Sequence, residues 1–181
     1  MASTRPDAAA RRLRLIPAVR FAGFLCLIVD LVALGAHLIE LPNKLAMSGP
    51  LWLQVQQSLY RGWGPFIGPF EAGAVVFAWL LAYLLRGRGT AFGLTLSAAL
   101  CLTLTLALFF VVVQPVNTAF AGWTPETIPV DWAAYRLRWE YGHAARAVLA
   151  ALAMTALVRA ALIERHPAPA ASEAHAGYAA R

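Results

Sequence analysis

Charged side chains are scarce in this chain of 181 residues, since Asp, Glu, Lys and Arg together make up 13% of it. Hydrophobic residues make up 60% of the sequence. Soluble domains are about half apolar and about a quarter charged. The composition therefore excludes an ordinary soluble globular protein, and it is too apolar for a disordered one. It predicts a membrane protein built as one domain.

Cysteine is almost absent, and the two present, Cys26 and Cys101, lie inside apolar runs without a CxxC motif. We interpret both as small hydrophobic residues, not as a disulfide framework. The sequence also has no G-x-S-x-G nucleophile motif and no glycine loop that could cradle a phosphate. These absences argue against a disulfide scaffold, a serine hydrolase of that type and a nucleotide-binding enzyme.

Four apolar runs are long enough to cross a bilayer, which takes about 20 residues each. They cover 17–41, 67–85, 90–113 and 141–163. The first run is longer than the ~7–15 residues of a signal-peptide core, so we interpret it as a retained span. The sequence predicts an all-α integral membrane four-helix bundle. Its expected divisions are a basic N-terminal segment (1–16), a four-span domain (17–165) and a disordered Ala/Pro/Ser-rich tail (166–181).

The positive charges predict the orientation. An even number of spans places both termini on one side, and cytoplasmic loops carry an excess of Lys and Arg. The terminal side holds ten of the fifteen Lys and Arg residues: Arg5, Arg11, Arg12, Arg14, Arg20, Arg86, Arg88, Arg159, Arg165 and Arg181. We therefore expect both termini in the cytoplasm, with the protein in a bacterial plasma membrane. The N-terminal arginines are too few and too local for a nucleic-acid footprint.

The two connections on the far side are long. In the first, 42–65, apolar residues recur every four positions at Leu51, Val55 and Leu59, which predicts a short amphipathic helix on the membrane surface. Pro42 and Asn43 are expected to end the helix before it. The second connection runs over 115–130, and Asp131 after it is a candidate N-cap for a helix of about 33 residues, ~50 Å long.

Polar and ionisable side chains inside a membrane are costly and usually functional. Here the runs carry them near the non-cytoplasmic face. Residues three apart share one helix face, so His37 lies with Glu40, and Glu140 lies with His143. If the first and fourth spans are antiparallel neighbours, the two histidines share one level and the glutamates a shallower one. The full set is His37, Glu40, Glu71, Gln114, Asn117, Glu140, His143 and Arg146. We expect all of these except Gln114 and Asn117 to point into one cavity that opens toward the non-cytoplasmic face. The rings of His37 and His143 should then lie within ~10 Å of each other, since neighbouring helices are about 8–10 Å apart.

Several chemistries fit this set. Glutamates and E-x-x-H pairs on facing helices build di-iron sites, and imidazole with carboxylate suits iron, copper, manganese or zinc. The candidate metal ligands are His37, Glu40, Glu71, Glu140 and His143. Two facing histidines could also clamp a haem, although the glutamates disfavour this. The plainer alternative is interfacial histidines with ion pairs of Glu140 to Arg136 and Glu40 to Lys44. Asp30, two turns deeper than His37, is given no chemistry.

The stretches His37-Leu-Ile-Glu40-Leu-Pro-Asn-Lys and Trp139-Glu140-Tyr-Gly-His143-Ala-Ala-Arg146 give the chain a family resemblance. Over residues 20–163 it resembles the anthrone-oxygenase-like family of small four-span membrane proteins. Some fungal members oxidise anthrones to anthraquinones with molecular oxygen and are thought to need no cofactor. The resemblance implies His143 as general base, with His37 as second choice. It implies Arg146 and Asn117 as the groups that stabilise the developing oxyanion.

The function expected from these features is that of a membrane-embedded oxidoreductase or oxygenase acting on a small lipophilic molecule. The alternative is a non-catalytic binding or accessory protein for a metal, lipid or small molecule. A transporter fits less well, because the ionisable groups gather at one face. The expected partners are the lipid bilayer and the small molecule, without nucleic acid. The sequence leaves three alternatives open: an enzyme or a protein without activity, a transition metal or no cofactor, and a homodimer or a monomer.

Overall fold

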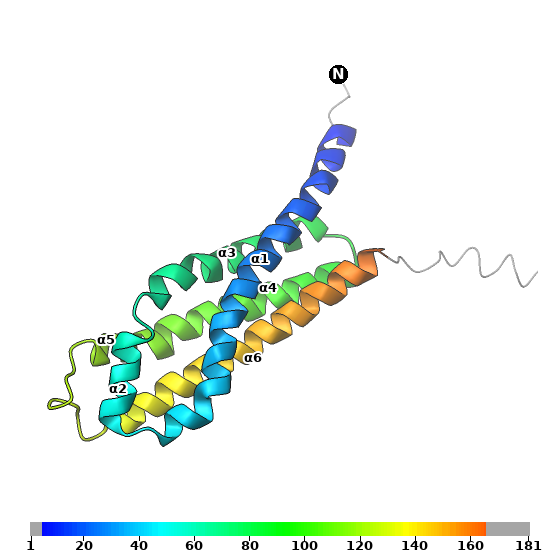
Figure 1. The fold of residues 1–181 in the computed structure, drawn as a ribbon. Helices are drawn as coiled ribbons and strands as arrows, with labels where there is room; N and C mark the ends of the chain where they lie inside the picture. The colour runs from blue at the N-terminus through cyan, green and yellow to red at the C-terminus, as the bar shows by residue number, and fades with distance from the viewer. Residues whose placement is uncertain (1–4, 166–181) are drawn as a thin grey trace, which may run out of the picture.

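The computed structural model describes residues 5–165, and all regular structure in that range is helical (Figure 1). The predicted all-α four-helix bundle is confirmed. The long helices α1 and α4 each pack against both α3 and α6, which gives an up-and-down bundle. The predicted tail at 166–181 lies outside the described residues. The elements are α1 (Arg5–Ala46), α2 (Gly49–Ser58), α3 (Trp63–Leu85), α4 (Thr90–Leu108), the π-helix η1 (Phe109–Val113), α5 (Gln114–Phe120) and α6 (Trp132–Arg165).

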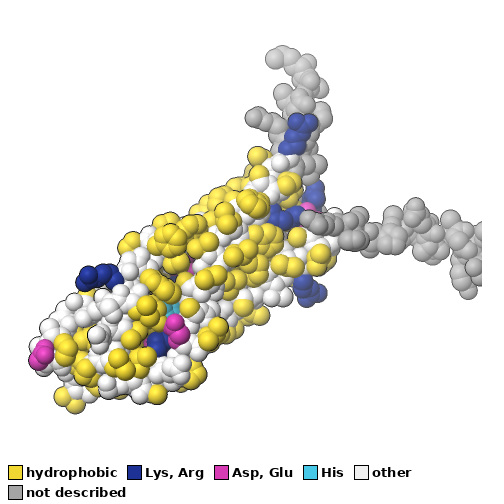
Figure 2. Space-filling model, in the orientation of Figure 1, with side chains coloured by type: hydrophobic (Ala, Val, Ile, Leu, Met, Phe, Trp, Pro, Cys, Tyr) yellow, Lys and Arg dark blue, Asp and Glu magenta, His cyan; other side chains and the backbone are white. Residues whose placement is uncertain are grey.

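The outer surface of the bundle is apolar. Within the described residues, four helical stretches are long and apolar enough to cross a membrane: Arg14–Ala46, Trp63–Leu85, Gly89–Phe120 and Trp132–Glu164. Hydrophobic side chains are spread over much of the surface in view, with backbone and other side chains between them (Figure 2). Phe21, for example, is 71% exposed and Val32 70%. Soluble monomers rarely expose such continuous apolar surface, so the bundle fits an integral membrane protein.

Small side chains fill the half of the bundle that ends in the α3–α4 hairpin. Alanine lets helix backbones approach closely. Such close packing holds helices together in a membrane, where the hydrophobic effect does not drive their association. Buried alanines occur on three of the four long helices of this half: Ala74, Ala78, Ala98, Ala99, Ala147, Ala150 and Ala153. This half is tightly packed and apolar, and most of the buried polar groups lie in the other half.

The expected end of the first span at residue 41 is wrong. Helix α1 continues through Pro42 to Ala46, and it also contains Pro17. A proline removes one backbone hydrogen bond, which membrane helices tolerate where neighbouring groups compensate. Lys44, half a turn past Pro42, is held by tertiary contacts described below, and these fix the last turn of the helix.

The expected helix between the first two spans is confirmed as α2. Its buried face carries Trp52, Leu53 and Gln56, whereas Leu51 and Leu59 are exposed. The placement of α2 on the membrane surface stays a prediction. The long fourth helix also occurs as expected, since α6 begins directly after Asp131 and has 34 residues. Cys26 and Cys101 are free and only partly buried.

The expected end of the third span at residue 113 is wrong as well, because helical structure continues through η1 and α5 to Phe120. In η1 the N–H of Gln114 donates to the carbonyl of Phe109, five residues back. Pro115 has no N–H, so the Val111 carbonyl lacks its usual α-helical donor. Arg138 of α6 supplies a replacement, with its guanidinium NH2 2.7 Å from the Val111 oxygen. A contact from α6 thus supports the helix across the proline.

Replacing Arg138 with methionine should therefore lower stability by about 1 kcal/mol, the usual net contribution of one hydrogen bond. Thermal unfolding of the purified protein in detergent measures the change. Arg159→Met is the matched control, since Arg159 is an exposed arginine of the same helix. Equal losses for both variants would contradict the role given to Arg138.

Candidate functional site

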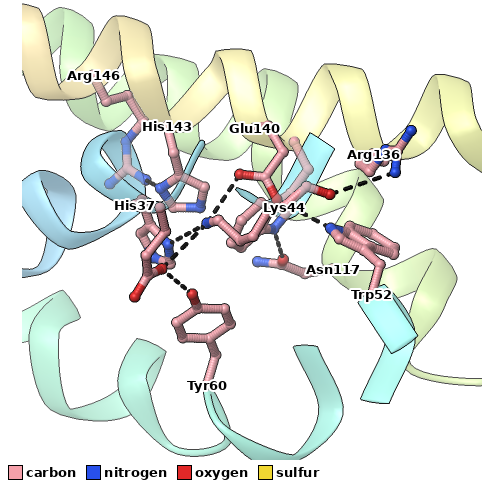
Figure 3. A network of polar contacts seen from close by, with 11 residues as sticks. His37, Lys44, Trp52, Tyr60, Asn117, Arg136, Glu140, His143 and Arg146 are labelled. Atoms are coloured by element: carbon pink, nitrogen blue, oxygen red, sulfur yellow. Dashed lines mark hydrogen bonds and ion pairs between the residues drawn. The ribbon is translucent and has the colours of Figure 1, made fainter. Parts of the chain in front are cut away.

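Lys44, the only lysine in the sequence, is buried at the end of α1. Its side chain is 2% exposed, and its Nζ lies 2.9 Å from Glu140 Oε2 and 3.5 Å from Glu40 Oε2. It also lies 3.2 Å from Nδ1 of His37 (Figure 3). One ammonium group therefore holds two carboxylates and an imidazole from α1 and α6.

Two aromatic side chains complete this group. The indole N–H of Trp52 on α2 donates to Glu140 Oε1 at 3.0 Å, and the Tyr60 hydroxyl donates to Glu40. Burial, together with the hydrogen bond to Glu40, raises the pKa of Tyr60, so its hydroxyl keeps its proton near neutral pH. We call this set the Lys44 cluster: Lys44, Glu40, Glu140, Trp52 and Tyr60.

Arg146 on α6 is the second buried cation, and its side chain is 3% exposed. Its NH2 lies 2.7 Å from Glu71 Oε2, and its NH1 lies 3.1 Å from Nδ1 of His143. The guanidinium also lies over the Phe109 ring, 4.9 Å from the centroid. Arg146, Glu71 and His143 form what we call the Arg146 cluster, which joins α3 to α6.

The two histidines connect the clusters. The ring centroids of His37 and His143 are 4.3 Å apart, with an angle of 39° between the planes. Trp139 packs against both rings, at 4.9 Å from His37 and 4.2 Å from His143. The expected approach of the two rings to within about 10 Å on neighbouring helices is confirmed.

The contacts of the histidines indicate which nitrogen carries the proton. Lysine and arginine side chains only donate hydrogen bonds. Nδ1 of His37 faces Lys44 and Nδ1 of His143 faces Arg146, so both Nδ1 atoms must accept. In a neutral imidazole the proton then resides on Nε2. Each histidine is therefore arranged as a hydrogen-bond donor through Nε2, with its basic nitrogen already engaged.

A cavity of about 490 Å³ lies beside the Arg146 cluster. Of the predicted site residues, His37, Glu71, His143, Arg146 and Gln114 line it. Glu40, Glu140 and Asn117 do not line it, so the sequence-based expectation that both glutamates face a common cavity is wrong. Glu40 and Glu140 turn instead toward Lys44, and the Asn117 side chain accepts a hydrogen bond from Trp139 at 2.7 Å.

The lining shows where the cavity opens. All of its α1 and α6 residues are buried, so these helices form its floor. Its exposed lining residues come only from α3 and from η1 and α5: Gly64, Pro65, Ala72, Phe110 and Gln114. Ala72 and Phe110 belong to stretches that are long and apolar enough to span a membrane.

Gly142 allows α6 to approach the π-helix. A Cβ at this position would lie 3.0 Å from side-chain atoms of both Val112 and Val113. The absence of a side chain here lets η1 lie close to α6, next to His143. Because π-turns widen a helix and often occur at functional sites, η1 is a natural rim for the cavity.

Sequence reasoning assigned no chemistry to Asp30, yet this residue lines the cavity and is 0% exposed. Neither of its carboxylate oxygens has a hydrogen-bond partner among the described residues. The Oε1 atom of Glu71 is buried and unpartnered in the same way. An acidic residue in the middle of a span was the available signal for Asp30. Sequence reasoning also missed that Lys44 is the centre of a cluster, because a helix end was expected before it.

The partners of the candidate ligands indicate whether the site could bind a metal ion. Glu40 and Glu140 neutralise Lys44, and Glu71 neutralises Arg146, so these carboxylates already face cations. Among the described residues, no group of three or more His, Cys, Asp or Glu is arranged to hold a metal ion. The five-residue metal centre suggested by the sequence is not supported by this geometry, which favours a charge network.

The general-base role of His143, its second choice His37, and the oxyanion roles of Arg146 and Asn117 stay predictions. The geometry brings His37, His143 and Arg146 together at the cavity and leaves Asn117 outside its lining. No protein-family model, curated protein or solved structure matches this chain.

Proposed function

We propose that the protein binds a small lipophilic molecule in the 490 Å³ cavity and oxidises it with molecular oxygen, as an anthrone-oxygenase-like membrane protein. The observation that carries the proposal is a cavity whose exposed lining residues belong to apolar stretches long enough to span a membrane, with histidine and arginine side chains also in its lining. A lipophilic substrate would enter from the hydrocarbon phase. Its polar part would meet the only buried polar groups that face the cavity among the described residues.

The chemistry proposed is proton removal from a C–H bond activated by a carbonyl. The substrate oxygen would accept hydrogen bonds from Nε2 of His37 and His143 and from Arg146, which would stabilise the enolate as it forms. Glu71 Oε1, unpartnered at the cavity, is the geometrically available proton acceptor. The carbanion would transfer electrons to O2. For a CH2 group oxidised to C=O, one oxygen atom enters the product and the other leaves as water.

This proposal changes the sequence-based assignment of the base. His143 was the first choice, but its Nδ1 faces Arg146. The Oε1 atom of Glu71 has no hydrogen-bond partner among the described residues, so it can accept a proton without breaking an existing contact. We further propose the predicted orientation, with both termini cytoplasmic, which places the cavity in the non-cytoplasmic half of the bilayer.

The proposal is tested by filling the cavity. Ala33 is buried and lines it, so Ala33→Leu should project into the space and abolish oxidation of an added anthrone. Ala145→Leu is the matched control, because Ala145 is exposed on α6. The measurements are oxygen uptake and ¹⁸O incorporation from ¹⁸O2 by the purified protein, with metal content and an optical spectrum recorded on the same sample.

The outcomes separate the candidate functions. Wild-type turnover that survives chelation and disappears in Ala33→Leu supports the cofactor-free oxygenase. If turnover is proportional to the content of a stoichiometrically bound metal, the reaction is metal-dependent and the cofactor-free proposal is wrong. Saturable anthrone binding without oxygen uptake would favour the binding or accessory protein. If Ala33→Leu and Ala145→Leu have equal turnover, the cavity is not the site of the reaction.

A further inference from the structure

The floor of the cavity contains hydrogen-bond acceptors without donors. Asp30 is completely buried, and neither of its oxygens has a partner among the described residues. Glu71 contributes one more unpartnered buried oxygen on the facing wall. Burying a carboxylate without a partner is expensive, so such groups are usually paired with a donor. Here no described side chain supplies that donor.

The two buried cations nearest the cavity already have partners within the protein. Arg146 pairs with Glu71 through NH2 and with His143 through NH1, and its guanidinium lies over Phe109. Lys44 is occupied by the Lys44 cluster on the other side of the histidines. Among the described residues, no cationic side chain forms a hydrogen bond or ion pair with Asp30, and the cavity gives a ligand direct access to its carboxylate.

The rest of the lining selects an apolar body. Trp63, Phe109 and Phe110 line the cavity together with Leu34, Ile67 and Leu106. Aromatic and aliphatic walls with a few polar groups at one end are typical of pockets for small lipophilic ligands. A ligand oriented by these walls would have its polar end directed to the Asp30 floor.

We infer that Asp30 recognises the polar end of the ligand, so that the cavity selects lipophilic molecules carrying a hydrogen-bond donor, a hydroxyl or a protonated amine. This inference rests on the proposed function only because it uses the same cavity. It adds the chemical class of the polar group that the ligand must carry. The donor of the ligand would satisfy the carboxylate that the protein leaves unpartnered. The apolar part would fill the space toward the mouth.

The test compares three probes of one shape: 1-naphthol, 1-naphthylmethylamine and the donorless 1-methylnaphthalene. Calorimetric titration of the full-length protein in lipid nanodiscs, corrected with empty nanodiscs, gives the affinities. We expect the wild type to bind at least one donor-bearing probe about tenfold or more tightly than 1-methylnaphthalene. Tighter binding of the naphthol identifies a hydroxyl as the headgroup, and tighter binding of the amine identifies a cation.

Asp30→Ala should weaken the preferred probe about tenfold to a hundredfold, the usual range for a hydrogen bond to a charged group, and leave 1-methylnaphthalene unchanged. Because Asp30 has no partner to lose, the variant should fold, with a melting temperature equal to or above that of the wild type. Asp131→Asn is the control, since Asp131 is exposed and outside the cavity lining.

The results distinguish this inference from the proposed function. If all three probes bind the wild type equally well, the role of Asp30 is wrong and the cavity remains a lipophilic site. If the donor-bearing probes keep their affinity in folded Asp30→Ala, the role is wrong for the same reason. If none of the probes binds the wild type, both the inference and the proposed cavity function are overturned. The wild-type comparison needs no variant, so the inference stays testable if Asp30→Ala does not fold.

Discussion

Replacing Lys44 with methionine should destabilise the protein by about 3–5 kcal/mol, the largest stability effect expected for a single site. The substitution removes the ammonium group that lies 2.9 Å from the fully buried Glu140 carboxylate. Methionine fills the same space but leaves a negative charge without a counterion. The free energy of unfolding in a detergent and denaturant titration, or the melting temperature, measures the loss.

Two further variants identify the cause. Arg61→Met, at an exposed position between α2 and α3, should change stability little. Lys44→Met combined with Glu140→Gln should recover a large part of the loss, because the uncompensated charge is removed together with its partner. A double variant no more stable than Lys44→Met alone would show that the packing of the lysine stem, and not its charge, stabilises this end of the bundle.

Replacing Arg146 with methionine should lower kcat by about 10²–10³, the range observed when a donor to a developing oxyanion is removed. In the proposed reaction Arg146 donates to the substrate oxygen and also keeps Nδ1 of His143 as an acceptor. Steady-state kinetics with an anthrone measures kcat and KM separately. The loss should fall mainly on kcat, since the apolar walls that bind the substrate are unchanged.

Arg146 also pairs with Glu71, so the variant must be separated from simple unfolding. The charge-neutral double variant Arg146→Met/Glu71→Leu should restore much of the melting temperature, which measures how much of the lost stability comes from the unpaired Glu71 carboxylate. This variant reports on stability only, because Glu71 is the proposed proton acceptor. Arg146→Lys, which keeps the charge but loses the planar fork, should have intermediate activity. Near-normal kcat in a folded Arg146→Met protein would exclude the proposed oxyanion role.

The sequence predicted the helices well because their signal is local. Runs of about 20 apolar residues define the spans, and the spacing of His37, Glu40, Glu140 and His143 correctly placed the two histidines at one level. Helix ends were predicted poorly at Pro42 and Pro115. At both places the helix continues because a side chain from elsewhere provides contacts, and no local pattern contains that information.

The partners of the carboxylates could not be predicted from spacing. Residues three apart share a helix face, but each face is more than 100° wide, and the glutamates and histidines point to different neighbours within it. Glu140 turns to Lys44 and Trp52, whereas His143 turns to Arg146 and the cavity. Asp30 was visible as an intramembrane acid, but only the three-dimensional packing shows that it has no partner.

The π-helix η1 sets the orientation of the helical residues that follow it, up to Phe120. The turn between Phe109 and Gln114 contains one residue more than an α-helical turn, and each residue of an α-helix turns the chain by about 100°. If the same residues were wound as a regular α-helix, α5 would be rotated by about 100° about its axis, and Asn117 would no longer meet Trp139. The contact of α5 with Trp139 therefore depends on how residues 109–113 are wound. A substitution that converts this segment into a regular α-helix would rotate every helical residue after it, whereas deletion of one residue within the π-turn would keep their orientation.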